Sequence, residues 1–375
     1  MTLSRFKHSL YSVPVLLLLV VGLPTLAAAG AKIKIDDTKY FQIGMGFRGS
    51  MAVAEDGAPS GTDPSFNFQH DSMRLYTVSQ VHKNIQIEYN TRLNTTDDSI
   101  NVLDAVAKIN FSAFEFWLGR QLPPSDRSNL DGPFYLNAAW SFPMVQSFGN
   151  IGSGCCGRDN GAAIHGDVKG GKFKWAYGLF EGSQGASDTE DRLKHAARID
   201  FALGDPEPGF YTGSTYFGAK KLTTVGFVYQ AEADAAGTAT NQGDFSGFGL
   251  DVLIERTLGN GAVVDLEGAF YDWDTEDVQD TTFIQGDSYL LLASYLMPNK
   301  TSIGGLQGKL QPFFRYQGYN RSMANAAGYH GFHSLAETGI NYVIDGFNAK
   351  ITAFWSVDRD VTETHSGLLA MQFQL

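Results

Sequence analysis

Apolar and polar residues alternate along most of the chain after residue 30, which is the pattern of a β-strand with one apolar and one wet face. In the stretch 41–48, Phe41, Ile43, Met45 and Phe47 share one face, and polar or small residues occupy the other. The same period of two recurs at 85–90, 173–179, 197–203, 310–317 and 349–356. No comparably clear amphipathic helix pattern follows the N-terminal segment. The sequence therefore predicts an all-β fold.

About sixteen such segments can be counted, each of roughly ten residues, which is the length that a tilted strand needs to cross a bilayer. The connections between them alternate in length. Tight ones occur at 112–113, 170–172, 259–261 and 345–346, and long polar ones at 54–65, 121–160, 231–244 and 272–286. A soluble β-sandwich has no reason to keep two classes of connection. We therefore predict an antiparallel transmembrane β-barrel of about 16 strands, with short periplasmic turns and long extracellular loops.

The alternation continues to the C-terminus, where Leu369, Met371, Phe373 and Leu375 share one face. A chain that ends inside a strand is expected if that strand pairs with the first one, because closing the sheet removes both exposed edges. Substrates of the bacterial barrel-assembly machinery end in such a strand, typically with Phe where this chain has Leu. We therefore expect this machinery as a partner.

Residues 1–29 have the pattern of a signal peptide for export. Arg5 and Lys7 form a basic start, residues 10–26 are apolar, and small residues at 27–31 match a cleavage site after residue 29 or after residue 31. A retained membrane anchor is the alternative. We expect residues 30–375 to form a single β-barrel domain in the cell outer membrane of a Gram-negative bacterium.

Composition excludes several classes of protein. The chain of 375 residues has a formal net charge of -12, which argues against a nucleic-acid partner. It has only 2 cysteines, too few for a disulfide-stapled scaffold. These are Cys155 and Cys156, adjacent in the longest predicted loop, so a bridge between them would be strained and the sequence leaves their pairing open.

Motifs of enzyme and cofactor sites fail in their context. Residues 44–49 match G-x-G-x-x-G, but the alternation runs straight through these glycines, where a dinucleotide site needs a strand that turns into a helix. Residues 166–172 fit the start of a P-loop, but Phe173 stands where magnesium binding needs Ser or Thr. The nucleophile motif G-x-S-x-G does not occur. We expect no enzyme activity, no cofactor and no metal site.

Six short stretches resemble, in order, the phosphate-selective porin family (O and P type) of Gram-negative outer membranes. They are 119–124 (GRQLPP), 157–161 (GRDNG), 177–182 (YGLFEG), 197–201 (ARIDF), 310–317 (LQPFFRYQ) and 339–346 (GINYVIDG). The resemblance implies a sixteen-stranded homotrimeric channel for small hydrophilic solutes or ions, set in outer-membrane lipid and lipopolysaccharide. It also implies a loop that folds inward and narrows the pore, which by position is 121–160.

Basic residues on the predicted wet faces and in this loop are the candidates for tuning ion preference. They are Arg120, Arg127, Arg158, Arg198, Arg315 and Lys174. A channel selective for anions such as phosphate needs a ladder of basic side chains along its lumen. The same predicted faces also carry many Asp and Glu residues, and opposite charges on neighbouring strands can pair. We therefore expect general diffusion through a paired wall, with an anion ladder as the alternative.

Two other kinds of outer-membrane barrel remain as rival hypotheses for the function. One is a surface enzyme such as a lipase or protease, and the other is a structural or adhesive barrel that does not conduct. A transporter closed by an N-terminal plug is disfavoured, because only residues 32–39 precede the first predicted strand after the signal.

Overall fold

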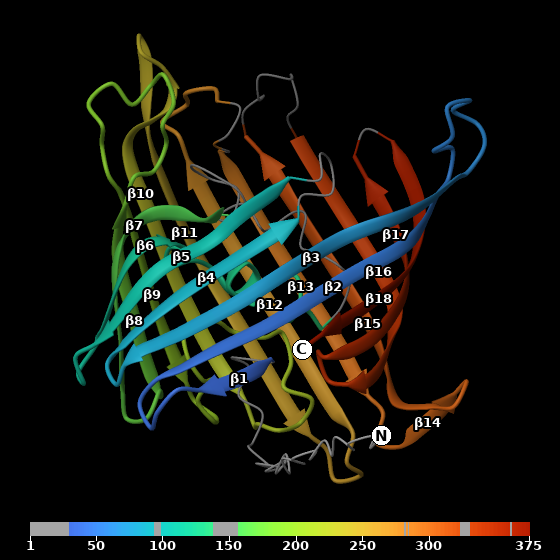
Figure 1. The fold of residues 1–375 in the computed structure, drawn as a ribbon. Helices are drawn as coiled ribbons and strands as arrows, with labels where there is room; N and C mark the ends of the chain where they lie inside the picture. The colour runs from blue at the N-terminus through green and yellow to red at the C-terminus, as the bar shows by residue number, and fades with distance from the viewer. Residues whose placement is uncertain are drawn as a thin grey trace, which may run out of the picture.

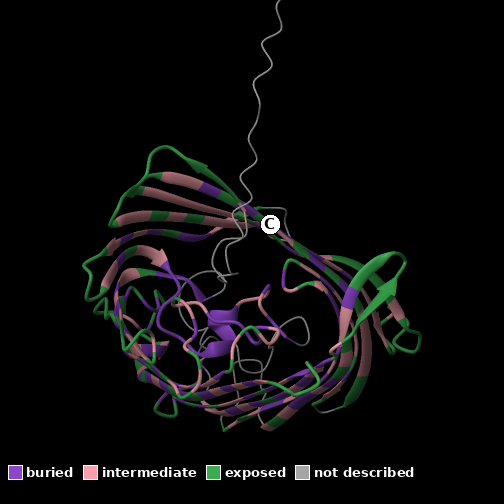
Figure 2. Ribbon diagram, turned by 90° about the horizontal axis from the view of Figure 1, so that it is seen from below, coloured by how far each residue is buried: buried purple, intermediate pink, exposed green. Residues whose placement is uncertain are grey.

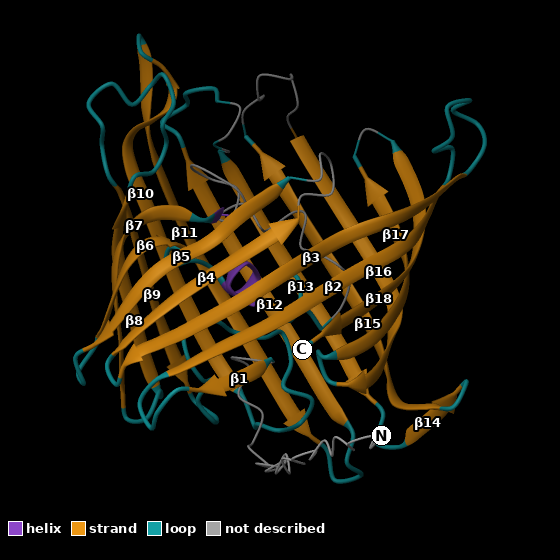
Figure 3. Ribbon diagram, in the orientation of Figure 1, coloured by secondary structure: helices purple, strands orange, loops and turns teal. Residues whose placement is uncertain are grey.

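The computed structural model describes residues 30–93, 99–137, 157–280, 283, 285–322, 331–360 and 362–375. Within these ranges the chain is almost entirely β-strand, with one short helix, α1 (Arg127–Asp131) (Figure 3). No helix in the described ranges is long and apolar enough to cross a membrane. The predicted signal peptide, 1–29, and the Cys155–Cys156 pair lie outside the described residues.

Sixteen long strands form a closed antiparallel barrel, which confirms the predicted fold class (Figure 1). They are β2 (Tyr40–Ala54), β3 (Ser65–His82), β4 (Ile85–Leu93), β5 (Ile100–Asn110), β6 (Glu115–Gln121), β7 (Asp159–Val168), β8 (Phe173–Phe180), β9 (Lys194–Ala202), β10 (Thr223–Thr238), β11 (Asn241–Thr257), β12 (Val263–Asp274), β13 (Gly286–Leu296), β15 (Leu306–Arg321), β16 (Gly331–Asp345), β17 (Ala349–Arg359) and β18 (Glu363–Gln374). Each strand pairs with the next of this set.

The last strand closes the barrel by pairing with the first. Residues 366–374 of β18 lie antiparallel to residues 46–54 of β2. Two short strands extend the ladder beyond the ends of their neighbours: β1 (Ala31–Lys34) pairs with the start of β2, and β14 (Lys300–Ile303) with the start of β15. Among the described strands, closure leaves no long edge unpaired, as a barrel in lipid requires.

Apolar side chains point outward from the barrel, and polar ones point into it. On β2, Met45 and Phe47 are 49% and 40% exposed, whereas Arg48 and Ser50 are buried. The apolar belt continues around the barrel through Leu75, Tyr89, Leu118, Tyr177, Ile199, Phe227, Leu250, Phe270, Leu291, Phe314, Ile340, Trp355 and Met371. An apolar exterior around a polar interior is the reverse of a soluble protein, and it is the arrangement that hydrocarbon favours.

The connections fall on two rims, as predicted, with two departures. All four predicted tight turns are found on one end, which we term the short-turn rim and which lies at the bottom of Figure 1. On this same rim, however, the connection between β9 and β10 is long, covering residues 203–222. The predicted pattern of tight turns on this rim is therefore wrong at this connection.

The expected long loop at 231–244 is wrong, because β10 continues to Thr238 and β11 begins at Asn241. The two strands form an extended hairpin at the other end of the barrel, which we term the long-loop rim. Ala235, Ala236 and Phe245 are buried in an apolar cluster with Trp273 and Phe283, so the hairpin gains a packed face where a polar loop was predicted.

Candidate functional site

The connection from β6 to β7 turns into the barrel. Its first described part, 122–137, is termed the inner loop; it is buried almost throughout and places α1 inside the ring of strands (Figure 2). Asp126 caps the helix by accepting a hydrogen bond from the backbone N of Asn129 at 3.1 Å. Gly132, with a φ of 57°, ends it. Residues 122–137 of the predicted loop 121–160 thus fold inward.

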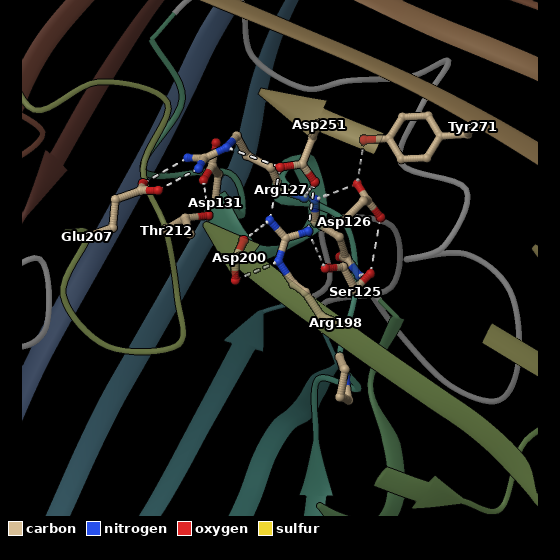
Figure 4. A network of polar contacts seen from close by, with 12 residues as sticks. Ser125, Asp126, Arg127, Asp131, Arg198, Asp200, Glu207, Thr212, Asp251 and Tyr271 are labelled. Atoms are coloured by element: carbon tan, nitrogen blue, oxygen red, sulfur yellow. Dashed lines mark hydrogen bonds and ion pairs between the residues drawn. The ribbon is translucent and has the colours of Figure 1, made fainter. Parts of the chain in front are cut away.

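A buried arginine on the wall holds the start of the inner loop (Figure 4). Arg198 on β9 donates from Nη1 to Asp251 Oδ2 at 2.7 Å and from Nη2 to Asp200 Oδ1 at 2.6 Å. The same Nη1 donates to the carbonyl oxygen of Ser125 at 3.1 Å. Asp251 in turn accepts from the backbone N of Arg127 at 3.1 Å. The loop backbone is therefore tied to both β9 and β11.

A second buried arginine belongs to the loop itself and binds the long connection of the short-turn rim. Arg127 pairs with Glu207 through two bonds, Nη1–Oε1 at 2.9 Å and Nη2–Oε2 at 2.6 Å. The hydroxyl of Tyr216 donates to the same carboxylate at 2.9 Å. Burial disfavours the charged carboxylate, but Arg127 outweighs this effect and lowers the pKa of Glu207 to about 2.

Residues 203–222, which we term the infolded turn, enter the barrel from the short-turn rim and contact the inner loop. Thr212 donates its hydroxyl to Asp131 at the end of α1. The backbone N of Ser214 donates to the carbonyl of Tyr135 at 3.0 Å, and its hydroxyl accepts from the backbone N of Asn137 at 3.0 Å. Two segments that enter from opposite rims therefore bind each other inside the lumen.

The far part of the inner loop is held at the seam between the first and last strands. Arg48 on β2 and Gln372 on β18 face each other in the ladder. They donate to consecutive loop carbonyls, Arg48 to Pro133 at 2.6 Å and Gln372 to Phe134 at 2.8 Å. Lys350 on β17 donates to the carbonyl of Leu136 at 2.6 Å. The inner loop thus crosses the lumen from β9–β11 to the seam.

The lumen wall has a basic side and an acidic side. Arg48, Arg74 and Arg92 lie on the adjacent strands β2, β3 and β4, and Arg74 and Arg92 are direct partners in the ladder. Within the described residues, neither Arg74 nor Arg92 forms an ion pair. The wall across the barrel, β11 and β12, buries a set of carboxylates: Asp251, Glu255, Asp265 and Glu267.

Five of the six basic residues predicted from the sequence lie inside the barrel. Four of them form buried ion pairs: Arg127 with Glu207, Arg158 with Asp104 at 3.3 Å, Arg198 with Asp200 and Asp251, and Arg315 with Glu337. The fifth, Lys174, donates to the carbonyl of Gly209 at 3.0 Å and forms no ion pair among the described residues. The expected pairing of opposite charges is thus present at these positions.

Arg120 lies on the other face of the wall. The ladder between β5 and β6 runs without a shift from Trp117 to Arg120, so Arg120 shares the face of Leu118, whose side chain is 56% exposed. Trp117 and Gln121, on the opposite face, are buried. Arg120 therefore points away from the lumen, contrary to the predicted facing.

Four residues that matter for the site were not among the candidates chosen from the sequence. Arg74 and Arg92 lie on strands whose alternation was visible, but charge alone did not rank them above the paired arginines. Glu207 lies in a Pro- and Gly-rich connection with no periodic pattern, so nothing local indicated that it enters the barrel. Phe134 lies in the inner loop, where alternation carries no information.

A cavity of about 410 Å³ opens between the infolded turn and the wall near the short-turn rim. Lys174, Arg198 and Glu207 contribute to its lining, together with His165 and Phe210. No group of three or more His, Cys, Asp or Glu side chains in the described ranges is arranged to hold a metal ion.

The chain matches no protein-family model and no characterised protein sequence. Among solved structures, it is similar to an anion-selective porin from Comamonas acidovorans, with 12% identity and a TM-score of 0.60 over 90% of this chain and 100% of that one. OmpF of Salmonella typhi in complex with daunomycin has 11% identity and a TM-score of 0.61, covering 92% and 100%. The trimer form of OmpT, an outer membrane protein of Vibrio cholerae, has 11% identity and a TM-score of 0.54, covering 90% and 100%. At these identities the similarity concerns the fold, which is that of outer-membrane porins.

Proposed function

We propose that this chain is an outer-membrane porin that lets small hydrophilic solutes and ions diffuse through a water-filled lumen. The observation that carries the proposal is the combination of an apolar belt outside with a polar, charged lumen inside, across which a loop is fastened. A polar lumen of this kind is what hydrated solutes need, and an inner loop leaves them a narrowed path.

We further propose a preference for anions, including phosphate, in keeping with the resemblance to the O and P type family. Arg74 and Arg92 support this, because their charges are not balanced by an ion pair among the described residues. Arg127, Arg158, Arg198 and Arg315 contribute less, since carboxylates already neutralise them. An uncompensated positive charge beside the path attracts anions and repels cations.

A homotrimer is the assembly that we propose, with the wall of β6 to β9 at its centre. Strands β6 and β8 have 7 and 8 residues. At about 3.3 Å per residue and a tilt of about 40°, they rise roughly 20 Å or less, below the apolar band of about 25 Å. On the outer face of this wall, the Tyr177 hydroxyl and His195 Nδ1 lie 2.8 Å apart. We term β6 to β9 the low wall. An exposed polar pair on this wall suits contact with another subunit better than contact with lipid. The similar protein of Vibrio cholerae has a trimer form.

Export and insertion complete the proposal. We propose that residues 1–29 are removed as a signal peptide, with residue 31 as the other cleavage position, and that the barrel-assembly machinery inserts the chain into lipid and lipopolysaccharide of the outer membrane. The intact mass of the protein purified from outer membranes gives the cleavage position directly. A full-length mass would support the retained anchor.

Single-channel currents in planar bilayers under a salt gradient test the function. We expect discrete open steps, a reversal potential that indicates anion preference, and a shift towards cations in Arg74→Glu and Arg92→Glu. Arg192→Glu is the matched control, because Arg192 lies in an exposed outer connection and pairs with Glu190. A folded, inserted barrel that never conducts would overturn the proposal in favour of a surface enzyme or a structural barrel. Equal reversal potentials in all variants would contradict the proposal that Arg74 and Arg92 set the ion preference.

A further inference from the structure

We propose that the infolded turn is a second constriction element of the pore, and that Glu207 is the residue that positions the inner loop on it. This inference rests on the proposed channel function. Its basis is that the lumen is narrowed from both rims, by residues 122–137 from one side and residues 203–222 from the other.

The contact between the two segments is buried and specific. Glu207 is 3% exposed and Arg127 is 0% exposed, and they are joined by two parallel bonds. The guanidinium of Arg127 also donates to the carbonyl of Gly213 at 3.2 Å, so it binds the turn at two points. A bidentate Arg–carboxylate pair fixes distance and orientation together, which a single contact does not.

The infolded turn also reaches the neighbouring part of the wall, formed by β5, β6 and β7. The Phe210 ring lies 5.4 Å from the ring of Trp117 on β6 and 4.5 Å from that of His165 on β7, centroid to centroid. Lys108 on β5 lies 5.9 Å from the centroid of the Tyr211 ring. The turn starts and ends at β9 and β10, so its tip lies against a wall two to four strands away. Solutes that enter from the short-turn rim must pass beside it.

The remaining contacts secure the turn from the wall behind it. The Thr215 hydroxyl donates to Glu255 on β11 at 2.9 Å and to Asp265 on β12 at 3.3 Å. The backbone N of Gly218 donates to Glu255 at 2.9 Å. These bonds hold the base of the turn, and the pair of Glu207 with Arg127 connects this base to the inner loop. Loss of that pair removes the charged contact between the two segments and leaves them joined only by neutral bonds, such as those of Thr212 and Ser214.

The test compares single-channel conductance of the full chain with four variants. Glu207→Gln removes the ion pair and keeps the side-chain shape. Glu207→Asp keeps the charge. Asp205→Asn is the matched control, since Asp205 is exposed on the same turn and its carboxylate accepts only the backbone N of Lys221 among the contacts found. A shortened turn, with 207–213 replaced by Gly-Ser-Gly, removes the element itself. The folded fraction of each is measured by the heat-sensitive gel mobility of the barrel.

We expect Glu207→Gln and the shortened turn to raise the conductance about twofold or more, because current through a water-filled constriction grows with its open cross-section. Liposome swelling should show that they also admit larger sugars than the wild type. Asp205→Asn should match the wild type, and Glu207→Asp should lie between. These results would support a positioning role, since a purely structural role would change the folded fraction and leave the conductance of folded channels unchanged.

Two outcomes would overturn the inference while leaving the proposed function intact. One is a conducting wild type with folded Glu207→Gln and shortened-turn variants of equal conductance and equal solute cut-off. The other is failure of both variants to fold, which would make the turn a requirement of folding. A wild type that inserts without conducting would instead overturn the proposed function, and with it this inference.

Discussion

The ring of Phe134 lies 5.7 Å from the guanidinium carbon of Arg74. It packs so closely on β2 that a Cβ added at Gly46 would come within 2.8 Å of the ring. The tip of the inner loop therefore covers part of the basic wall with an aromatic face, an arrangement that cations and aromatic rings favour.

Phe134→Ala should uncover this wall. We expect a higher single-channel conductance and a reversal potential shifted further towards anions, because Arg74 then faces water without the ring. Phe68→Ala is the control, since Phe68 on β3 is 86% exposed. An unchanged reversal potential in Phe134→Ala would show that the ring does not cover the conducting path.

Glu337→Gln should destabilise the barrel. Arg315 and Glu337 are partners in the β15–β16 ladder and are buried as a pair. Removing one partner of a buried ion pair costs about 3–5 kcal/mol, because the remaining charge stays desolvated. Urea unfolding in lipid vesicles measures this loss. The same change in the exposed pair of Arg359 with Glu363, Glu363→Gln, should cost much less, because solvent screens both charges. Equal losses at both sites would contradict the assignment of Arg315 and Glu337 as a desolvated pair.

Asp126→Asn should change how stability depends on pH. Burial, with the nearby charge of Asp251, raises the pKa of Asp126 from its usual 3.8 to about 6. The folded state thus holds the proton more tightly than the unfolded state. Its stabilising contribution is full below about pH 4 and is lost as the pH rises through about 6. Asn caps a helix as well as Asp and carries no charge.

We therefore expect Asp126→Asn to gain stability relative to the wild type between about pH 4 and pH 7, by up to about 3 kcal/mol. Unfolding measured in vesicles at several pH values checks the difference between the two proteins, which removes the titration of other groups. A difference that stays constant with pH would contradict the raised pKa.

Ala197→Trp should weaken the proposed trimer. Ala197 lies on the outer face of β9, within the low wall, where a small side chain lets another subunit approach. Ala293→Trp places the same bulk on the outer face of β13, a wall that we expect to face lipid. Native gel electrophoresis and chemical crosslinking should show monomers for the first variant and trimers for the second. Trimers in both would exclude β9 from the interface.

The fold could be predicted because the alternation within each strand shows which side chains face outward and which face the lumen. Phe41 to Phe47 alternate along β2 regardless of what the rest of the chain does, and the lengths of connections separate the two rims. The hairpin at 231–244 was not predicted, because Ala235 and Ala236 are small enough to suit either a loop or a buried strand end. Only the tertiary packing of this region, in which the rings of Phe245 and Phe283 lie 4.8 Å apart, decides between them.

The site could be predicted only in part, because its contacts join segments far apart in the sequence. Arg127 and Glu207 are 80 residues apart, and neither segment has a periodic pattern that would indicate burial. Arg120 illustrates a second limit. Its facing depends on whether the ladder shifts at Gly119, and the sequence between Trp117 and Gln121 does not reveal the absence of a shift. Pairing of charges, by contrast, was foreseeable from their mixed signs on neighbouring strands.

The bonds from Arg48 and Gln372 to the inner loop also bear on how long the folded barrel lasts. The seam between β2 and β18 is where the sheet was closed, and it is the natural place for a barrel to reopen. Here the two strands are also fastened from inside to a segment that is itself anchored on β9 and β11. Parting the seam and displacing the loop are therefore one event with one activation barrier. Such coupling slows unfolding more than it changes the equilibrium, so the barrel should persist mainly by kinetic resistance.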